Sequence, residues 1–441
     1  MAGISDKQLL PELGPWPAGI DNMSPETALT RSDDGKKVIA LREAVNVDLD
    51  KAGWPRGHRP GRERVVECTS GHSFFGAPQF PYLLFCDGTT MYGWTPGNDP
   101  FDLVDSLFNA EVSYAQVSDR VFWSNGRDTG IVLSTGMNVA WGVETPAGQP
   151  NLSLGDGALP AGNYQVAITF RTGQGEESGT PLAANIDAID KSAIVLSNIP
   201  QPTQNDVTTI RVYMSQANGD VLYFQRDLPR GMTTVTLPTY RGTIPLATQL
   251  LRKMPPGTIV RYMGGRMYVA AGDSLIWSEA MRYGQYNPAE NRVRIGAGLR
   301  MIEPVGEATD GVGMYASDAK RVMWLSGWDP WKWAAKRVCD APAIPGSSVV
   351  VSGKVWGFDT NEPVAYWLGA DGVAYVGMPG GQIVPLRQDQ VAGPTAEGAA
   401  SYFREGTGMR QIITALRRAS PIGMSLTDRV VDKVYRNGVE V

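Results

Sequence analysis

Histidine is nearly absent from this sequence, because only His58 and His72 occur among its 441 residues. Cysteine is also scarce: only Cys68, Cys86 and Cys339 occur, and their spacing fits no zinc-binding pattern. General-base, nucleophile and metal-site chemistry relies heavily on these two residue types. We therefore expect no catalytic residue, no cofactor and no bound metal, and three reduced thiols that mostly pack in the interior.

Charge of either sign is also low. Charged residues make up 19% of the chain, and 40 basic against 45 acidic residues give a net charge of −5. This balance excludes a broad basic field for gripping DNA or an anionic lipid surface. No run of 18 apolar residues occurs, and the amino terminus lacks a basic segment followed by an apolar run. We expect no membrane span, no signal peptide and synthesis in a reducing cytoplasm.

Glycine, proline and tryptophan are abundant by contrast, at 51, 31 and 12 residues. So many turn-forming residues, together with 42% apolar residues, exclude a coiled coil or a helical array and disfavour disorder. The composition is typical of a mostly-β globular chain, and the length predicts two or three domains.

Short apolar runs that flank tight turns recur along the chain. The turns lie at Asp87-Gly88, Ser118-Asp119, Gly264-Gly265, Ser317-Asp318 and Asp371-Gly372. Asp-Gly and Gly-Gly pairs between β-rich runs are strong hairpin signals. Their spacing predicts a series of small antiparallel sheets, as in a β-propeller-like body. A β-sandwich or an open meander is the alternative.

The interval between the second and third of these turns is too long for one such module by roughly 100 residues. Within it, Tyr164, Val166, Ile168 and Phe170 alternate with more polar residues, and Asn218-Gly219 marks another hairpin. Short strands with frequent turns favour an immunoglobulin- or fibronectin-type β-sandwich. The predicted domains are residues 1–145, the amino-terminal part of the body with a hairpin arm; 146–252, an inserted sandwich; and 253–441, the carboxyl-terminal part with a terminal helix.

That helix is expected near the end of the chain, where Ser425 to Asp428 offer caps. Leu426, Val430, Val431 and Val434 form an apolar stripe at helical spacing, and Asn437-Gly438 is a good stop.

A basic cluster lies in a Gly/Pro-rich segment between two strand-like runs, 43–50 and 65–68. Its members are Arg56, Arg59, Arg62 and Arg64. We predict a long hairpin with a basic tip, which either docks on an acidic subunit or a phosphate backbone or is simply a solvated end.

Three tryptophans gather in the segment Trp328-Asp-Pro-Trp-Lys-Trp333. Indoles beside a proline favour a protein interface or a platform for a sugar ring, and a packing corner between modules is the alternative. Because no polar set for reading a sugar is evident nearby in the sequence, we predict that Trp328, Trp331 and Trp333 belong to a subunit interface.

Two further patterns suggest ligand sites only superficially. Gly173–Gly179 misses the spacing of a dinucleotide loop and leads into Pro181, where a helix would be needed. Asn46–Asp50 has the first ligands of a calcium loop, but Lys51 and Gly57 replace its required glycine and glutamate. We interpret both as ordinary β-hairpin or loop segments.

Four passages carry a family resemblance. They are Gly19–Pro25 with Leu41–Asp50, Gly53–Arg56 and Arg59–Gly61; Gly265–Gly272 with Ile276–Glu279; Gly313–Ser317 with Trp324–Gly327 and Asp329-Pro330; and Ala365–Gly372. In order and spacing the chain resembles the tail nozzle or hub proteins of short-tailed bacteriophages, also called packaged-DNA stabilisation proteins. The predicted insert is a departure from that family, and some long-tailed phages have comparable proteins.

The resemblance implies a non-enzymatic virion protein, assembled in the host cytoplasm and located in the tail. It implies a ring of copies of the chain, a hexamer, below the portal and adaptor, in contact with tail fibre or tail-tip proteins. Genomic DNA would pass through the ring without sequence-specific binding. The rival interpretation is a receptor- or glycan-binding tail protein, with or without glycan hydrolase activity. A third is an unrelated bacterial surface protein built on the sandwich.

Overall fold

The computed structural model describes residues 65–296, 298–307, 311–386, 391, 393–406 and 409–419. It also describes 15–16, 18, 20–24, 29–33, 36–42, 47–49, 54–58, 435–436 and 439–440. The chain groups into two compact units. Unit 1 is Met1–Val65, Glu303–Gly327 and Ala334–Val441, and unit 2 is Val66–Ile302 with Trp328–Trp333.

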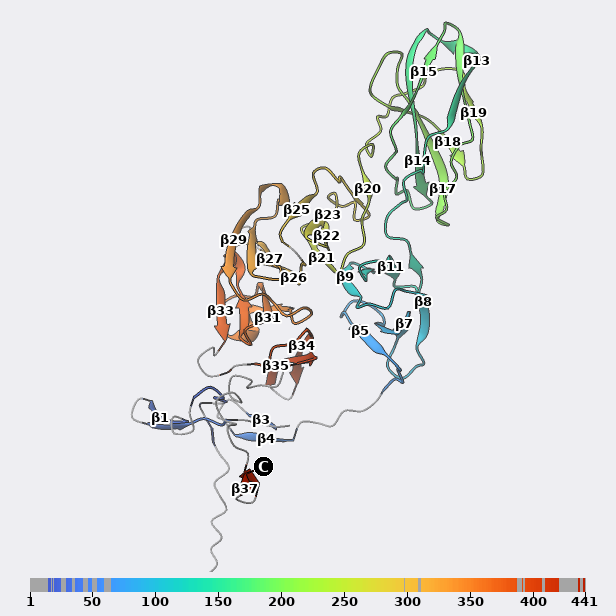
Figure 1. The fold of residues 1–441 in the computed structure, drawn as a ribbon. Helices are drawn as coiled ribbons and strands as arrows, with labels where there is room; N and C mark the ends of the chain where they lie inside the picture. Colours follow the sequence, from blue (N-terminus) through green and yellow to red (C-terminus); the bar gives the residue numbers. More distant parts are fainter. Residues whose placement is uncertain are drawn as a thin grey trace, which may run out of the picture. The chain divides into compact units, whose positions relative to one another are not determined.

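The predicted mostly-β fold class is confirmed, since strands are the only long elements of the described residues (Figure 1). Outside the predicted insert, these residues form five four-stranded sheets of consecutive or nearly consecutive strands. None closes into a barrel. In the described part of the chain, no helix is long and apolar enough to cross a membrane.

Three of these sheets lie in unit 2. Their strands are β5 (Gly71–Phe75), β6 (Leu83–Asp87), β7 (Thr90–Trp94) and β8 (Phe101–Val104); β9 (Ser113–Val117), β10 (Arg120–Ser124), β11 (Thr129–Leu133) and β12 (Asn138–Val139); and β21 (Ile259–Met263), β22 (Arg266–Ala271), β23 (Ser274–Trp277) and β25 (Arg292–Arg294). A short pair, β20 (Arg252–Lys253) and β24 (Gln285–Tyr286), adjoins them in sequence.

The other two four-stranded sheets follow in the chain. Their strands are β26 (Met301–Val305), β27 (Gly313–Ser317), β28 (Val322–Ser326) and β29 (Ala334–Cys339); and β30 (Val349–Ser352), β31 (Pro363–Leu368), β32 (Ala374–Gly377) and β33 (Ile383–Leu386). Two-stranded hairpins are β34 (Gly398–Gly406) with β35 (Met409–Arg417), β1 (Thr30–Asp33) with β2 (Lys36–Ile39), β3 (Val47–Leu49) with β4 (Pro55–His58), and β36 (Tyr435–Arg436) with β37 (Val439–Glu440). Each of the five turns predicted from the sequence connects two of these strands.

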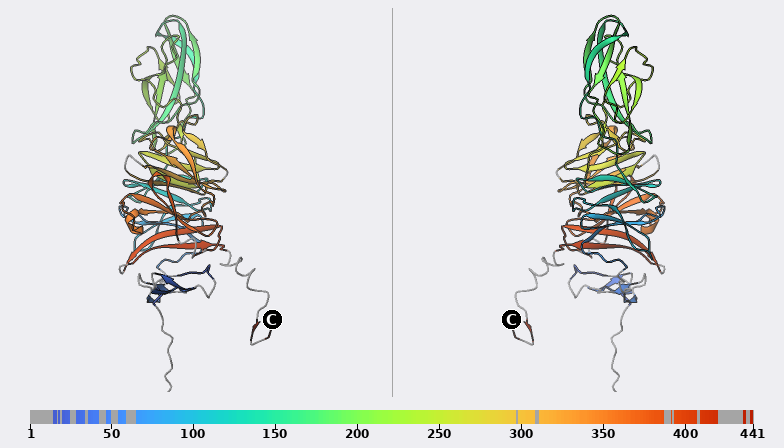
Figure 2. Two further views of the ribbon diagram at one scale, coloured as in Figure 1. Left: turned by 90° about the vertical axis from the view of Figure 1, so that its left-hand side faces the viewer. Right: turned by 90° about the vertical axis from the view of Figure 1, so that its right-hand side faces the viewer.

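Seven strands, all within residues 146–252, form two further sheets of unit 2, drawn in green in Figure 1 and Figure 2. They are β13 (Asn151–Leu159), β14 (Gly162–Thr172), β15 (Ala184–Ala188), β16 (Ser192–Ser197), β17 (Val207–Met214), β18 (Tyr223–Pro229) and β19 (Val235–Leu237). One sheet has the order β13-β16-β19 and the other β15-β14-β17-β18. Both share one hydrophobic core, to which Tyr164, Val166, Ile168 and Phe170 all contribute as the alternation predicted. We refer to these two sheets as the insert.

Consecutive sheets of unit 2 pack against one another. Leu84 and Met91 of one sheet share a core with Val121 and Trp123 of the next. On its other side, the sheet β9–β12 shares a second core with β21–β23. Apolar side chains on alternate positions therefore bury both faces of the middle sheet.

Strand β10 ends in Ser124, a fully buried residue that bonds to a distant part of the chain. Its hydroxyl accepts a hydrogen bond from the backbone N–H of Gly257 at 3.0 Å and donates to the carbonyl of Asp128 at 3.2 Å. The side-chain oxygen of Asn125 accepts from the N–H groups of Arg127 and Asp128 at 3.0 and 2.6 Å. We refer to this arrangement as a serine clamp.

Strand β27 ends in a second serine clamp. The hydroxyl of Ser317, also fully buried, accepts from the N–H of Ala343 at 2.9 Å and contacts the carbonyl of Arg321 at 3.2 Å. Asp318 Oδ1 accepts from the N–H groups of Lys320 and Arg321 at 2.7 and 2.9 Å. The offsets along the chain are the same as at Ser124, so the two sheets contain a repeated local structure.

The two clamps differ in the length of chain that they close. Ser124 and Gly257 are 133 residues apart, and Ser317 and Ala343 are 26 apart. The difference of 107 residues is the length of segment 146–252. This agreement supports the interpretation of that segment as an insertion between two modules of one kind.

Two sequence predictions concern the ends of the chain. The terminal helix proposed for 425–434 lies outside the described residues. The hairpin arm was expected to pair 43–50 with 65–68, but its second strand is β4, with Val47 opposite His58 and Leu49 opposite Pro55. That prediction was wrong because Pro55, which lacks an N–H, is tolerated at the start of a short edge strand. Arg56 therefore lies within a strand and not at the tip.

Candidate functional site

The segment Trp328–Trp333 folds as one turn of 3-10 helix, Pro330–Lys332, and groups with unit 2. Asp329 caps this turn, since its carboxylate accepts from the N–H of Trp331 at 3.2 Å. Lys332 pairs with the same carboxylate at 3.1 Å, and its hydrogen bond holds the pKa of Asp329 below the ordinary range. Proline at the first helical position and aspartate before it are typical of such a start.

Two of its indoles pack on strands β22 and β23. The ring of Trp333 stacks on Tyr268 and crosses Trp277, with both centroid distances at 5.7 Å. Trp331 meets Trp277 edge to face at 5.9 Å. The guanidinium of Arg266 lies 4.5 Å from the centroid of Trp331. We refer to these five residues as the aromatic cluster.

The aromatic cluster combines an exposed ring, that of Trp331, with two buried rings, those of Tyr268 and Trp277, which we call its buried floor. Trp331 is 46% exposed, whereas Tyr268 and Trp277 are buried. The hydroxyl of Tyr268 and the indole N–H of Trp277 are buried without a hydrogen-bond partner among the described residues. Burial raises the pKa of Tyr268, which therefore keeps its proton. Such unpaired buried donors are rare, because each forfeits its hydrogen bonds to water.

Charged groups surround the exposed indole. Arg266 donates to the carbonyl of Ser278 at 2.7 Å and lies 3.9 Å from the carboxylate of Glu279. With Asp329 and Lys332, the site offers both donors and acceptors beside an aromatic surface.

The third indole, Trp328, lies against the turn between β21 and β22. A Cβ added to Gly264 would stand 2.6 Å from its ring, and one added to Gly265 would stand 3.2 Å from the sulfur of Met281. Both glycines have positive φ, so the turn needs them for its backbone as well. Trp328 is 40% exposed and Met281 is exposed, which leaves an apolar surface around this turn.

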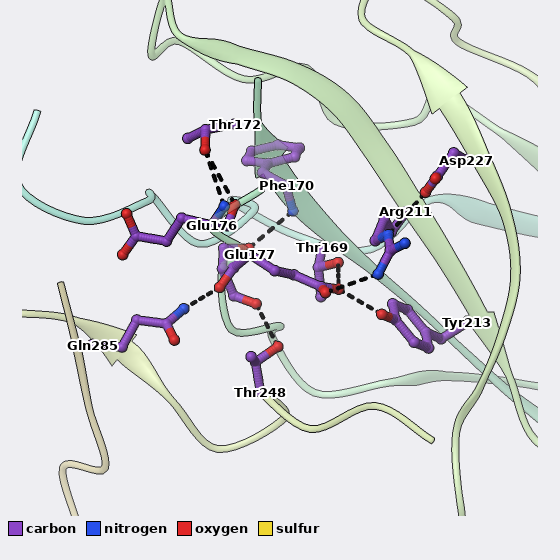
Figure 3. Close-up of polar contacts among 11 residues, drawn as sticks. Thr169, Phe170, Thr172, Glu176, Glu177, Arg211, Tyr213, Asp227, Thr248 and Gln285 are labelled. Atoms are coloured by element: carbon purple, nitrogen blue, oxygen red, sulfur yellow. Dashed lines mark hydrogen bonds and ion pairs between the residues drawn. The ribbon is translucent and has the colours of Figure 1, made fainter. Parts of the chain in front are cut away.

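A second polar site lies in the insert, around Glu177 (Figure 3). One oxygen of its carboxylate accepts from the hydroxyls of Thr169 and Tyr213, each at 2.6 Å. The other accepts from Arg211 at 3.1 Å, and Arg211 also donates to Asp227 at 2.9 Å. The network ties the loop that contains Glu177 to the outer face of strands β14 and β17.

The main chain beside Glu177 connects the insert to the strand β24. The side-chain amide of Gln285 donates to the carbonyl of Glu177, and Thr248 donates to the carbonyl of Ser178 at 2.6 Å (Figure 3). The Glu177 network therefore holds the base of the insert in place. We assign it a structural role, since both oxygens of the Glu177 carboxylate bond to side chains of strands β14 and β17.

The predicted site residues have separate outcomes. Trp328, Trp331 and Trp333 come together on β21–β23, and whether they contact another subunit stays a prediction. Arg56 belongs to β4, and Arg59, Arg62 and Arg64 lie outside the described residues. Sequence reasoning missed Arg266, Tyr268 and Trp277, although all lie in the passages that carried the family resemblance.

Cys86 and Cys339 are buried thiols outside any disulfide, and burial raises the pKa of Cys86 to about 11. Within the described residues, no cluster of three or more histidine, cysteine, aspartate or glutamate side chains is arranged to hold a metal ion.

Comparisons with known proteins add little. No protein-family model and no curated protein matches the chain. Among solved structures, the crystal structure of the computationally designed Ika8 protein matches 81% of this chain and 97% of its own, at 10% identity and a TM-score of 0.25. A likeness this weak carries no argument about fold or function.

Proposed function

We propose that the protein is a structural component of a bacteriophage tail, a nozzle or hub subunit with a propeller-like body. The observation that carries the proposal is the series of four-stranded sheets with a repeated serine clamp. A propeller is built from four-stranded antiparallel blades in series, and repetition of a local structure between sheets is expected there. The insert would be an immunoglobulin- or fibronectin-type sandwich placed between two blades.

In this proposal, copies of the chain form a closed ring around the DNA channel, below the portal and adaptor. A net charge of −5 suits such a channel, because tight binding of phosphates would hinder the passage of DNA. The family resemblance adds tail fibre or tail-tip proteins as further neighbours and the virion tail as the location.

Native mass spectrometry of the purified full chain tests the proposal. We expect a closed ring, a hexamer. A monomer or a trimer would contradict it and would favour the rival interpretation, a receptor-binding tail protein.

The apolar surface around the turn between β21 and β22 is the interface that we propose within the ring. Trp328→Ala and Met281→Ala should each shift the population toward smaller species, because exposed aromatic and methionine side chains dominate such contacts. Leu182→Ala is a suitable control, since Leu182 is an exposed apolar residue of the insert. Rings that form normally from both variants would exclude this surface as the interface.

A further inference from the structure

Two of the five buried side-chain donors without a hydrogen-bond partner among the described residues lie together in the aromatic cluster, next to the exposed indole of Trp331. The hydroxyl of Tyr268 and the indole N–H of Trp277 have no hydrogen-bond partner among the described residues, and the rings above them belong to a short segment with a single helical turn. Packing alone would be served as well by phenylalanine at position 268. A ligand with hydroxyl groups would satisfy both donors.

The surrounding groups narrow the class of ligand. Arg266 and Lys332 donate, whereas Glu279 and Asp329 accept, and all four lie at or next to the aromatic cluster. A proline-rich peptide presents mainly carbonyl acceptors, because proline has no N–H, and would leave the two carboxylates unmatched. Sugar hydroxyls donate and accept, and the apolar face of a hexose ring stacks on an exposed indole.

We propose that the aromatic cluster is a saccharide-binding site, in which a neutral hexose unit stacks on Trp331. Its hydroxyls hydrogen-bond to Arg266, Glu279 and Asp329, and a small shift of segment Trp328–Trp333 brings the Tyr268 hydroxyl and the Trp277 N–H within reach. The site requires no bond to be made or broken. The site shares segment Trp328–Trp333 with the proposed ring interface, so Tyr268→Phe, at a buried residue outside that segment, is the variant that separates the two.

Titration of the full chain with short oligosaccharides of dextran, mannan and galactan tests the proposal, with calorimetry and indole fluorescence as readouts. We expect at least one to bind saturably. Trp331→Ala should weaken that binding by about tenfold or more, because it removes the stacking surface. Tyr268→Phe should weaken it by roughly three- to tenfold, because it removes one hydroxyl and leaves the packing intact.

Trp54→Ala is the matched control, since Trp54 is 48% exposed against 46% for Trp331, and it should bind as the unaltered chain does. The proposal fails if none of the three saccharides binds, if Tyr268→Phe binds unchanged, or if Trp54→Ala loses as much affinity as Trp331→Ala. Saturable binding of a proline-rich peptide in place of the saccharides would also overturn it.

Tyr268 is fully buried and does not reach a neighbouring subunit. A Tyr268→Phe variant that assembles normally but binds saccharide less well therefore separates this site from the ring interface. An unaltered chain that binds saccharide but forms no ring would refute the ring alone.

Discussion

The serine clamps at Ser124 and Ser317 share the bond to a distant backbone N–H and the turn capped by the following side chain, but they close very different lengths of chain, 133 and 26 residues. If the longer segment were flexible, its closure would cost roughly 0.6 kcal/mol more for each doubling of length. The insert avoids this cost because it has a core of its own and its two ends meet. Met254 donates to the carbonyl of Gly284 at 2.9 Å, and a Cβ on Gly142 would lie 2.4 Å from the same oxygen. In the proposed architecture, the insert therefore acts as a short connection between two modules.

Removal of the insert is the most drastic test of the comparison between the two clamps. In a variant that lacks residues 146–252 and joins the ends with two glycines, the Ser124 clamp should still form. All 12 tryptophans lie outside the deleted segment, so indole fluorescence reports on the rest of the chain alone. We expect the indole emission spectrum to be nearly unchanged and the indole unfolding transition to remain cooperative.

Deletion of a hairpin outside the insert provides the control. Removing β34 and β35, Gly398–Arg417, takes away strands and should alter the indole spectra. Loss of the native spectra in the variant without 146–252 would mean that this segment is an integral part of the body.

Substitution of the two clamp serines should have the next largest effect, a loss of unfolding free energy. Ser124→Ala and Ser317→Ala each leave a buried backbone N–H unpaired, which costs about 1–3 kcal/mol of unfolding free energy. Because the shared bond and the burial are the same, the two losses should agree within about 1 kcal/mol in chemical denaturation followed by indole fluorescence. The exposed Ser153 of the insert provides a control, Ser153→Ala, with little effect expected. If only Ser317→Ala lowered the unfolding free energy, the Ser124 clamp would contribute nothing to stability.

Sequence reasoning predicted the small antiparallel sheets and the alternating strand at Tyr164–Phe170 because both depend on local patterns. Asp-Gly and Gly-Gly turns, and alternation at Tyr164–Phe170, are set by backbone sterics and by one-sided burial. The clamps were missed because their signal is only a serine followed by asparagine or aspartate at the end of an apolar strand. Their partners, Gly257 and Ala343, contribute a backbone N–H, which has no signature in the sequence.

The aromatic cluster was half predicted for a related reason. Three indoles in six residues are conspicuous, but Arg266 and Tyr268 lie some 60 residues away and become their neighbours only through the packing of β22. The expectation of no polar set near the tryptophans considered sequence neighbours alone. In the folded chain Arg266 lies 4.5 Å from the ring centroid of Trp331 and 3.9 Å from the carboxylate of Glu279, so polar groups are present near the tryptophans.

The second residue of each clamp allows a finer test. Asn125 also donates through its amide to the carbonyl of Phe108 at 2.9 Å and to the carboxylate of Asp128 at 3.1 Å. Asn125→Asp replaces that donor by an acceptor beside a like charge and should cost about 1 kcal/mol or more. Asp318→Asn keeps the oxygen that caps its turn and should cost less than that. Equal losses in the two denaturation curves would contradict this difference between the clamps.

The smallest expected difference between the two regions is their response to acid. It depends on the carboxylate of Glu144, which lies where the chain enters the insert. Partial burial would raise the pKa of Glu144, but the hydroxyl of Thr203 at 2.6 Å and the N–H groups of Thr203 and Gln204 outweigh it and hold this pKa below 4.5. A folded-state pKa below the unfolded value stabilises the folded chain above pH 4.5, and the contribution is lost as the pH falls through the lower, folded-state value.

We therefore expect the amides of Thr203 and Gln204 to lose protection from hydrogen exchange as the pH falls below 4.5, after correction for intrinsic rates. In Glu144→Gln no carboxylate titrates there, so the protection of these two amides should be lower throughout and nearly independent of pH. The amide of Ala343, at the clamp without an insert, should keep its protection over the same range. If it lost protection together with the two junction amides, acid would be loosening the whole chain, and Glu144 would not be a local anchor of the insert.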